Sequence, residues 1–231
     1  MGNNIALFIK FSIPSYFGID ARNHGQSPHD DAMTYELMAE DVIELADTLN
    51  VETFILMGHS MGGKTAMRAA LMFPDRISKL IIVDIAPKAY PASHSVYFKA
   101  FEEIDWAKMK NRTEIDEALK TYEKNDGVRL FLAKNIDRLE TGGFAVKSNI
   151  PAIKSAYEHI GGDFKMDTVY NGKTLFIYGE KSNYLLEEDR PLINQHFPNN
   201  QYSMVKNASH WVHAENPSDF LNQLNQFLKS N

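Results

Sequence analysis

The chain has 231 residues, of which 44% are hydrophobic and 23% charged, a composition typical of a globular protein with a substantial apolar core. Its net charge of −6 repels polyanions, so we expect no nucleic-acid partner. The sequence contains no cysteine, which excludes disulfides and thiolate metal sites and fits a reducing compartment, so we expect a cytoplasmic protein.

Apolar spacing predicts alternating strands and helices toward both ends of the chain. The expected strands cover residues 16–20, 53–57, 80–84, 174–178 and 201–205, and the expected helices cover 34–49, 61–73 and a last helix from 216. Two fully apolar strands joined by one helix predict a parallel crossover. The sequence therefore predicts an α/β fold, with a mostly parallel sheet flanked by helices.

A long insertion follows the strand that ends at Asp84. Within it we expect a hairpin around residues 141–143 and four helices, the second with Thr113 and Asp116 at capping-box spacing. These helices cover residues 95–106, 114–123, 127–135 and 150–160. The insertion is too long for a connection, so we expect a helical cap. The predicted domains are a segment 1–15, a core formed by 16–87 and 172–231, and a cap at 88–171.

The segment GHSMGGKT at residues 58–65 satisfies two motif definitions. As G-x-S-x-G it is a nucleophile elbow, in which Ser60 sits on a sharp turn between two glycines. As G-x-x-x-x-G-K-[ST] it is a P-loop, in which Lys64 holds a phosphate and Asp84 reaches the magnesium shell. The P-loop gives no role to the insertion or to the C-terminal histidines. We therefore favour the elbow.

A serine nucleophile needs a neutral imidazole as base and an acid that fixes the imidazole tautomer. In this type of fold the base follows the last strand, which is the position of His210. His196 lies at an expected helix end, and His213 is expected to be structural. His210 and His213 could alternatively form an H-x-x-H metal pair, but the sequence shows no third ligand. We expect no metal and no cofactor.

The acid of the site is less evident from the sequence. The usual slot follows the strand at 174–178, but Ser182 stands where an Asp is expected. Asp84 ends the preceding strand and is the other position from which a carboxylate reaches His210; its alternative role is to accept N–H groups at the next turn. We favour Asp84 as the acid, with Glu180 as the fallback and Ser182 as a hydrogen-bonding partner.

With these motifs in place, the sequence resembles the α/β-hydrolase superfamily, and within it the small YbfF-type esterase branch. The resemblance runs from about residue 18 to the end. It is carried by IDARNHGQSP (19–28), GHSMGGK (58–64), VDIAP (83–87), SNY (182–184) and SHWVHAE (209–215). It implies an α/β-hydrolase fold with a helical cap, and esterase or thioesterase chemistry on an acyl substrate. It also places the triad acid on Asp84 and adds Ser182 to the network; we count His59 as a further supporting residue.

The first 15 residues depart from the family pattern. Family members begin with several strands and a His-Gly loop that supplies one oxyanion-hole N–H, and no His-Gly pair precedes the strand at 16–20. The N–H of Met61 supplies one donor, and no source of a second is visible. We expect an N-terminally truncated or mis-started chain, whose missing strands leave an unpaired apolar sheet edge.

The predicted function is that of a serine carboxylesterase or acyl thioesterase, with a Ser60-His210-Asp84 triad and an acyl-enzyme intermediate. The alternatives are a C–C hydrolase or synthase of the same fold, and a weakly active or inactive hydrolase relic. The expected partner is a small-molecule acyl ester or thioester. No apolar run approaches the length of about 18 residues that a membrane span requires.

Overall fold

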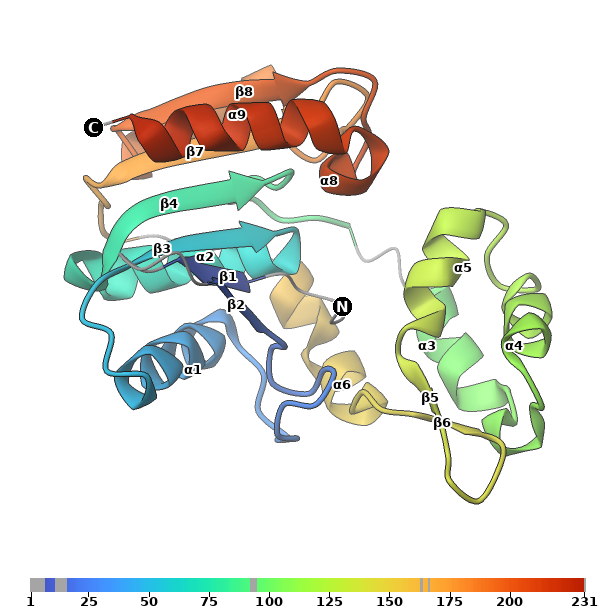
Figure 1. Ribbon diagram of the computed structural model, residues 1–231. Coiled ribbons are helices and arrows are strands. Elements are labelled where there is room, and N and C mark those ends of the chain that lie inside the picture. The colour runs from blue at the N-terminus through green and yellow to red at the C-terminus, as the bar shows by residue number, and fades with distance from the viewer. Residues whose placement is uncertain (1–6, 11–15, 92–94, 163, 166, 231) are drawn as a thin grey trace. The chain divides into compact units, whose positions relative to one another are not determined.

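Figure 1 shows the computed structural model of the chain, which describes residues 7–10, 16–91, 95–162, 164–165 and 167–230. Within these residues the main sheet has the strand order β2-β1-β3-β4-β7-β8. The strands are β1 (Leu7–Lys10), β2 (Tyr16–Ile19), β3 (Phe54–His59), β4 (Ile77–Val83), β7 (Lys173–Gly179) and β8 (Asn200–Val205). The strands β3, β4, β7 and β8 pair in parallel. The predicted α/β fold is confirmed.

Helices pack on this sheet because its central strands are apolar on both faces. Leu80 and Ile82 of β4 are fully buried, and Ile81 and Val83 between them are almost as deeply buried, which is the pattern of a strand covered on two sides. Helix α2 (Met61–Met72) packs against β3 and β4, and α1 (Tyr35–Thr48) packs against α2. Helix α9 (Pro217–Lys229) packs against β7 and β8.

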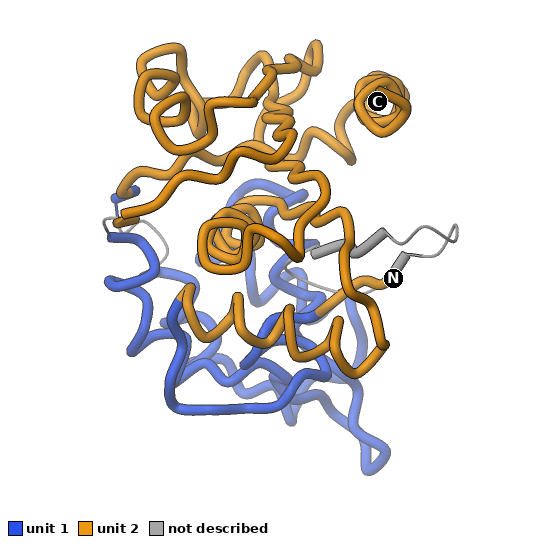
Figure 2. Tube along the Cα trace, turned by 90° about the vertical axis from the view of Figure 1, so that its left-hand side faces the viewer, with its two compact units in different colours: residues 1–4, 20–34, 90–162 blue, residues 5–19, 35–89, 163–231 orange. Residues whose placement is uncertain are grey.

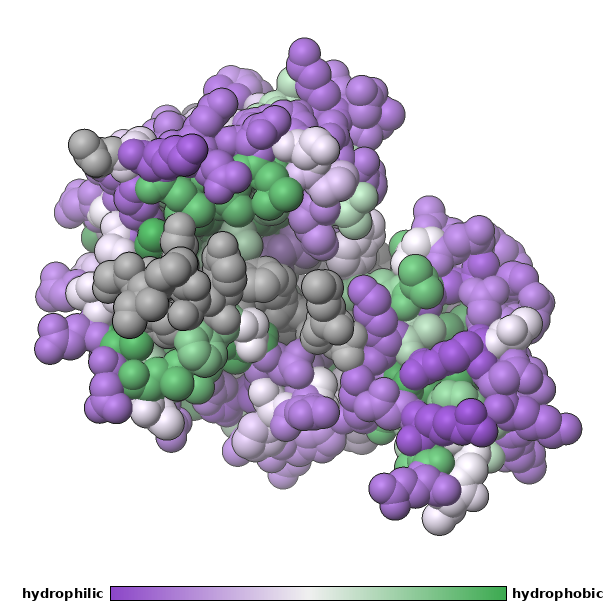
Figure 3. Space-filling model, in the orientation of Figure 1, coloured by the Kyte–Doolittle hydropathy of each residue, from purple (hydrophilic) through white to green (hydrophobic). Residues whose placement is uncertain are grey.

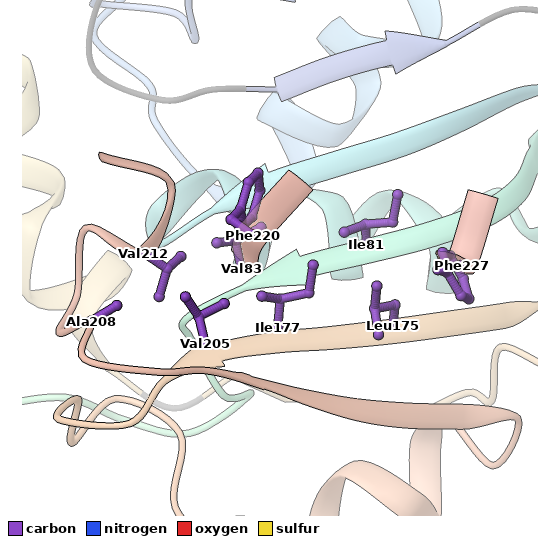
Figure 4. Packing of buried hydrophobic residues seen from close by; sticks show 9 residues of the cluster. All are labelled: Ile81, Val83, Leu175, Ile177, Val205, Ala208, Val212, Phe220 and Phe227. Atoms are coloured by element: carbon purple, nitrogen blue, oxygen red, sulfur yellow. The ribbon is translucent and has the colours of Figure 1, made fainter. Parts of the chain in front are cut away.

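One apolar cluster shows how α9 covers the sheet (Figure 4). Phe220 and Phe227 project from α9 onto side chains of three neighbouring strands. The other buried members are Ile81, Val83, Leu175, Ile177, Val205, Ala208 and Val212. Asn216 caps this helix by accepting a hydrogen bond from the N–H of Asp219 at 3.2 Å, so the predicted start of the helix is confirmed. The cluster lies beneath the loop that carries His210, because Ala208 and Val212 flank that residue.

The chain falls into two compact units, coloured separately in Figure 2. One unit contains the sheet and comprises residues 5–19, 35–89 and 163–231; the other comprises residues 1–4, 20–34 and 90–162. The second unit holds α3 (Ser95–Glu103), α4 (Arg112–Leu119), α5 (Asp126–Ala133), α6 (Ile150–Gly161) and the hairpin β5 (Ile136–Arg138) to β6 (Phe144–Val146). The domain boundaries drawn from the sequence remain a prediction.

The helices of the second unit follow the expected order, with two differences. The predicted helix at 95–106 is two elements, α3 and a 3₁₀ turn at Trp106–Lys108. The predicted capping box of α4 is wrong, because Asn111, not Thr113, accepts the hydrogen bond of Glu114 N–H at 3.0 Å. In this unit the loop at 20–34 is tied to the start of α6, since the carbonyl of Asn23 accepts from the N–H of Asn149 at 2.9 Å.

The N-terminal segment contributes a strand that the family pattern did not suggest. Strand β1 lies between β2 and β3 and is antiparallel to both. The outer strands of the described sheet are therefore β2 and β8, and Phe17 of β2 is 39% exposed. The rest of the segment 1–15 lies outside the described residues.

Most of the described surface in Figure 3 is hydrophilic, with smaller apolar areas on both units. The most exposed of the large apolar side chains is Leu130 of α5, at 68%. Across the ranges that the structure describes, none of the helices combines the length and the apolar character needed to cross a membrane.

Candidate active site

Ser60 occupies the sharp turn between β3 and α2. Its backbone lies at φ 54° and ψ −121°, a conformation that non-glycine residues rarely adopt. The close approach around it explains the first glycine of the motif, because a Cβ at Gly58 would lie 2.0 Å from the carbonyl oxygen of Gly62. This strained strand-to-helix turn is the geometry of a nucleophile elbow.

The same turn leaves no room for the phosphate loop that GHSMGGKT also spells. Helix α2 begins at Met61, directly after the serine, so the five residues that would surround a phosphate are already partly helical. Lys64 is 2% exposed, and its ammonium lies 5.7 Å from the ring centroid of Tyr35 and 5.9 Å from that of Phe164. Lys64 is thus a buried helix residue beside two aromatic rings.

Asp84 is placed beside Ser60 by strand register. His59 of β3 pairs with Val83 of β4. Ser60 follows His59 and Asp84 follows Val83, so the two residues lie at neighbouring ends of paired strands. The N–H of Ser60 donates to the carbonyl of Val83 at 3.1 Å, and the N–H of Asp84 donates to that of Ile177 at 2.8 Å. Asp84 is also at positive φ (50°), so two neighbouring strand ends carry a side chain in an unusual backbone conformation.

The carboxylate of Asp84 is fully buried and accepts three hydrogen bonds. One oxygen accepts from the N–H of Gly179 at 2.9 Å. The other accepts from the hydroxyl of Ser182 at 2.5 Å and from Nδ1 of His210 at 2.7 Å. Because Asp84 is the acceptor, Nδ1 of His210 carries the proton, which leaves Nε2 free to act as a base.

His210 is also held from two other sides. Nε2 of His59 donates to the carbonyl oxygen of His210 at 2.8 Å, and the two rings lie 4.6 Å apart. On the chain itself, the carboxylate of Glu215 accepts from the N–H of Ser209 at 2.7 Å and from that of Trp211 at 3.3 Å. These bonds fix the backbone on both sides of His210.

The environment of His59 keeps its ring uncharged. Burial is the main cause that holds the pKa of His59 well below its ordinary value, and the nearby His210 and His213 lower this pKa further. A neutral His59 has one N–H, which is the one that donates to His210. Desolvation alone would raise the carboxyl pKa of Glu215, but hydrogen bonds from Ser209 and Trp211 and the nearby His210 together lower this pKa below its ordinary value.

The other residues singled out in the sequence have structural partners. Glu180 accepts a hydrogen bond from the N–H of Asn207 at 2.7 Å, and Nδ1 of His196 bonds the carbonyl of Thr168 at 2.9 Å. The ring of His213 lies 5.2 Å from that of His59. No group of three His, Asp or Glu side chains within the described part of the chain has the arrangement of a metal site.

The structure thus joins Asp84, Ser182 and His210 by hydrogen bonds and places Ser60 at the adjacent strand end. The Ser60 hydroxyl makes no hydrogen bond to a described residue. Met61 is the first residue of α2, so its N–H has no partner within the helix. Two residues beside His210 were not singled out from the sequence, although the segments SNY and SHWVHAE contain them. Glu215 bonds the two chain neighbours of His210, and the ring of Tyr184 stacks on the imidazole at 3.9 Å.

With this geometry established, comparison with known proteins identifies the family. A model of the alpha/beta hydrolase fold matches residues 15–217, and the chain belongs to this family. The resemblance seen in the sequence is therefore confirmed.

Several similar proteins with assigned activities are esterases or lipases. The sn-1-specific diacylglycerol lipase ABHD11 of Danio rerio is 36% identical over 217 residues, which cover 91% of this chain and 68% of that protein. The esterase YbfF of Escherichia coli is 33% identical over 211 residues, which cover 91% of this chain and 81% of the relative. The solved structure of a marine microorganism esterase has a TM-score of 0.87 at 40% identity, covering 92% of this chain and 84% of its own. These relatives confirm the predicted class, hydrolases that act on ester bonds.

Proposed function

We propose that the chain is a serine hydrolase that cleaves carboxylic esters or acyl thioesters through an acyl-enzyme intermediate, with Ser60 as nucleophile, His210 as base and Asp84 as acid. The observation that carries the proposal is the 2.7 Å hydrogen bond from Nδ1 of His210 to the buried Asp84, one strand away from the Ser60 turn. This bond sets the tautomer that a serine nucleophile requires.

In the first half of the reaction, Nε2 of His210 takes the Ser60 proton as Oγ attacks the acyl carbon. The carbonyl oxygen becomes negative and accepts a hydrogen bond from the N–H of Met61, at the N-terminal end of α2. The intermediate collapses when His210 returns its proton to the departing alcohol or thiol, which leaves the acyl group on Ser60.

In the second half, His210 deprotonates a water molecule that attacks the acyl-enzyme. Collapse of the second tetrahedral intermediate releases the carboxylic acid and restores the Ser60 hydroxyl. Throughout, Asp84 stays ionised and stabilises the imidazolium, while Ser182 donates to the carboxylate oxygen that also holds His210.

The test is turnover of a series of p-nitrophenyl esters and acyl thioesters from short to long chains, with fluorophosphonate labelling of the active serine. Ser60→Ala should lose turnover and labelling, whereas the matched control Ser203→Ala, on β8, should keep both. A wild-type chain that neither turns over esters or thioesters nor reacts with the probe would contradict the proposal and favour the relic. Turnover confined to C–C bonded substrates would favour the C–C hydrolase instead.

A further inference from the structure

The loop after β7 carries Ser182, whose hydroxyl donates to Asp84, and it also brings the side chain of Tyr184 to His210. The ring of Tyr184 lies almost parallel to the imidazole, with the ring centroids 3.9 Å apart and the planes inclined by 22°. Aromatic pairs are more often offset or edge-to-face at larger separations. This close stacking therefore places the electron-rich face of the phenol ring directly against the imidazole.

The loop also links Tyr184 to the acid. The N–H of Tyr184 donates to the hydroxyl oxygen of Ser182 at 3.2 Å, and that hydroxyl donates to Asp84 at 2.5 Å. The same three-residue segment thus contacts the carboxylate through one side chain and the imidazole through another. Tyr184 is half-buried.

We propose that Tyr184 is a positioning residue for His210, whose ring fixes the plane of the imidazole and stabilises the positive charge that it acquires during acyl transfer. The proposal rests on the proposed role of His210 as the base. Asp84 holds one edge of the imidazole and does not by itself fix the plane of the ring, whereas the Tyr184 ring lies against that plane, closer than the His59 ring at 4.6 Å.

The charge effect follows from the groups that face His210. Asp84 lies at the edge of the ring, and Glu215 is a second carboxylate close enough to be influenced by the charge of His210. His59 stays neutral beside it. A cation over an aromatic face is stabilised by the ring quadrupole. The stack with Tyr184 is therefore stronger when His210 is protonated, which is its state in the transition state of both half-reactions.

The kinetic test compares Tyr184→Phe, which keeps the ring, with Tyr184→Leu, which removes it. Tyr202→Leu is the matched control, since Tyr202 stacks on Phe176 at 5.8 Å on β8. With a short-chain p-nitrophenyl ester, Tyr184→Leu should lower kcat by about 5- to 30-fold with KM changed less than about twofold. Tyr184→Phe and Tyr202→Leu should stay within about twofold of wild type.

A spectroscopic measurement tests the stack without turnover. The Cδ2 and Cε1 protons of His210 should resonate upfield in the wild type and in Tyr184→Phe, because of the ring current, and lose this shift in Tyr184→Leu. The Ser60→Ala control reports separately on the proposed function, so that a chain without esterase activity can still show the stack. If Tyr184→Leu does not fold, Tyr184→Met replaces it.

The proposal is overturned by any of three results. An unchanged kcat in Tyr184→Leu, or equal losses in Tyr184→Phe and Tyr184→Leu, would remove the role of the ring. If Tyr184→Leu changed KM and left kcat constant, Tyr184 would contact the substrate and would not position His210. Absence of the ring-current shift in the wild type would show that the two rings do not stack.

Discussion

Replacing Asp84 by Asn would remove the buried charge with almost no change in shape. Asn tolerates the positive φ of 50° at this position, and its oxygen can still accept the N–H of Gly179. The amide nitrogen would then face Nδ1 of His210, where Asp84 accepts a hydrogen bond at 2.7 Å. Because two donors repel, we expect the imidazole to take the other tautomer and present an N–H to Ser60.

The magnitude follows from the charge and the tautomer together. A carboxylate and an imidazolium about 4 Å apart attract each other by about 4 kcal/mol at an effective dielectric constant of about 20, a factor of about 10³ in rate. Asp84 has no exposed surface and the His210 side chain is 19% exposed, so water screens this attraction less than it screens a surface pair. The unfavourable tautomer adds to the loss. We expect kcat to fall by about 10³- to 10⁴-fold with KM little changed.

The assay is steady-state ester hydrolysis at pH 8, with thermal unfolding to verify that the variant folds. Glu180→Gln is the matched control, because Glu180 is a carboxylate of a neighbouring loop that accepts only the N–H of Asn207 among the bonds described. It should change kcat by less than about threefold. If Asp84→Asn retained more than about a tenth of kcat, the reasoning would be refuted, and a larger loss in Glu180→Gln would move the acid to that residue.

Two further predictions concern stability. Since burial, together with His210 and His213, lowers the pKa of His59 below that of the unfolded chain, the unfolded state binds the extra proton. The stabilising contribution of neutral His59 should therefore be fully present above about pH 6.5, and below that pH the free energy of unfolding should fall by up to about 1.4 kcal/mol per pH unit. In urea unfolding, His59→Gln should reduce this pH dependence, and an unchanged pH dependence would contradict the assignment. Gly58→Ala places a Cβ 2.0 Å from the Gly62 carbonyl and should lower stability by about 3 kcal/mol or more. Gly127→Ala, whose Cβ would meet only a side-chain oxygen at 3.2 Å, should change it by less than about 1 kcal/mol, and equal effects would refute the packing argument.

The sequence predicted the parallel strands because each is apolar on both faces. Leu80–Val83 reads as an uninterrupted apolar run, and all four side chains are buried. The elbow was predictable because its sharp turn requires glycine: only glycine fits where Gly58 approaches the backbone of Gly62. Asp84 could be proposed because parallel strands end at one edge of the sheet, which brings their following residues together.

What the sequence did not indicate depends on contacts between distant segments. No local pattern reveals that Tyr184 stacks on His210, 26 positions along the chain, or that Asn23 bonds Asn149. The cap of α4 was misplaced by two residues because Asn111 and Thr113 are both acceptable cap residues, and their relative merit depends on the exact start of the helix. Strand β1 pairs with β2 and β3, two partners that no local pattern in the first 15 residues identifies.

The pairing of His59 with Val83 has a consequence for how this protein can change over time. The separation of Ser60 and Asp84 is set by main-chain hydrogen bonds between β3 and β4, not by the particular side chains that fill the space around them. Exchanges among Ile, Val and Leu in these strands leave that spacing unaltered, whereas deletion of a single residue from either strand would move one group past the other. The interior can therefore drift in sequence while the chemistry stays in place, and gaps in these two strands are the changes that selection should remove.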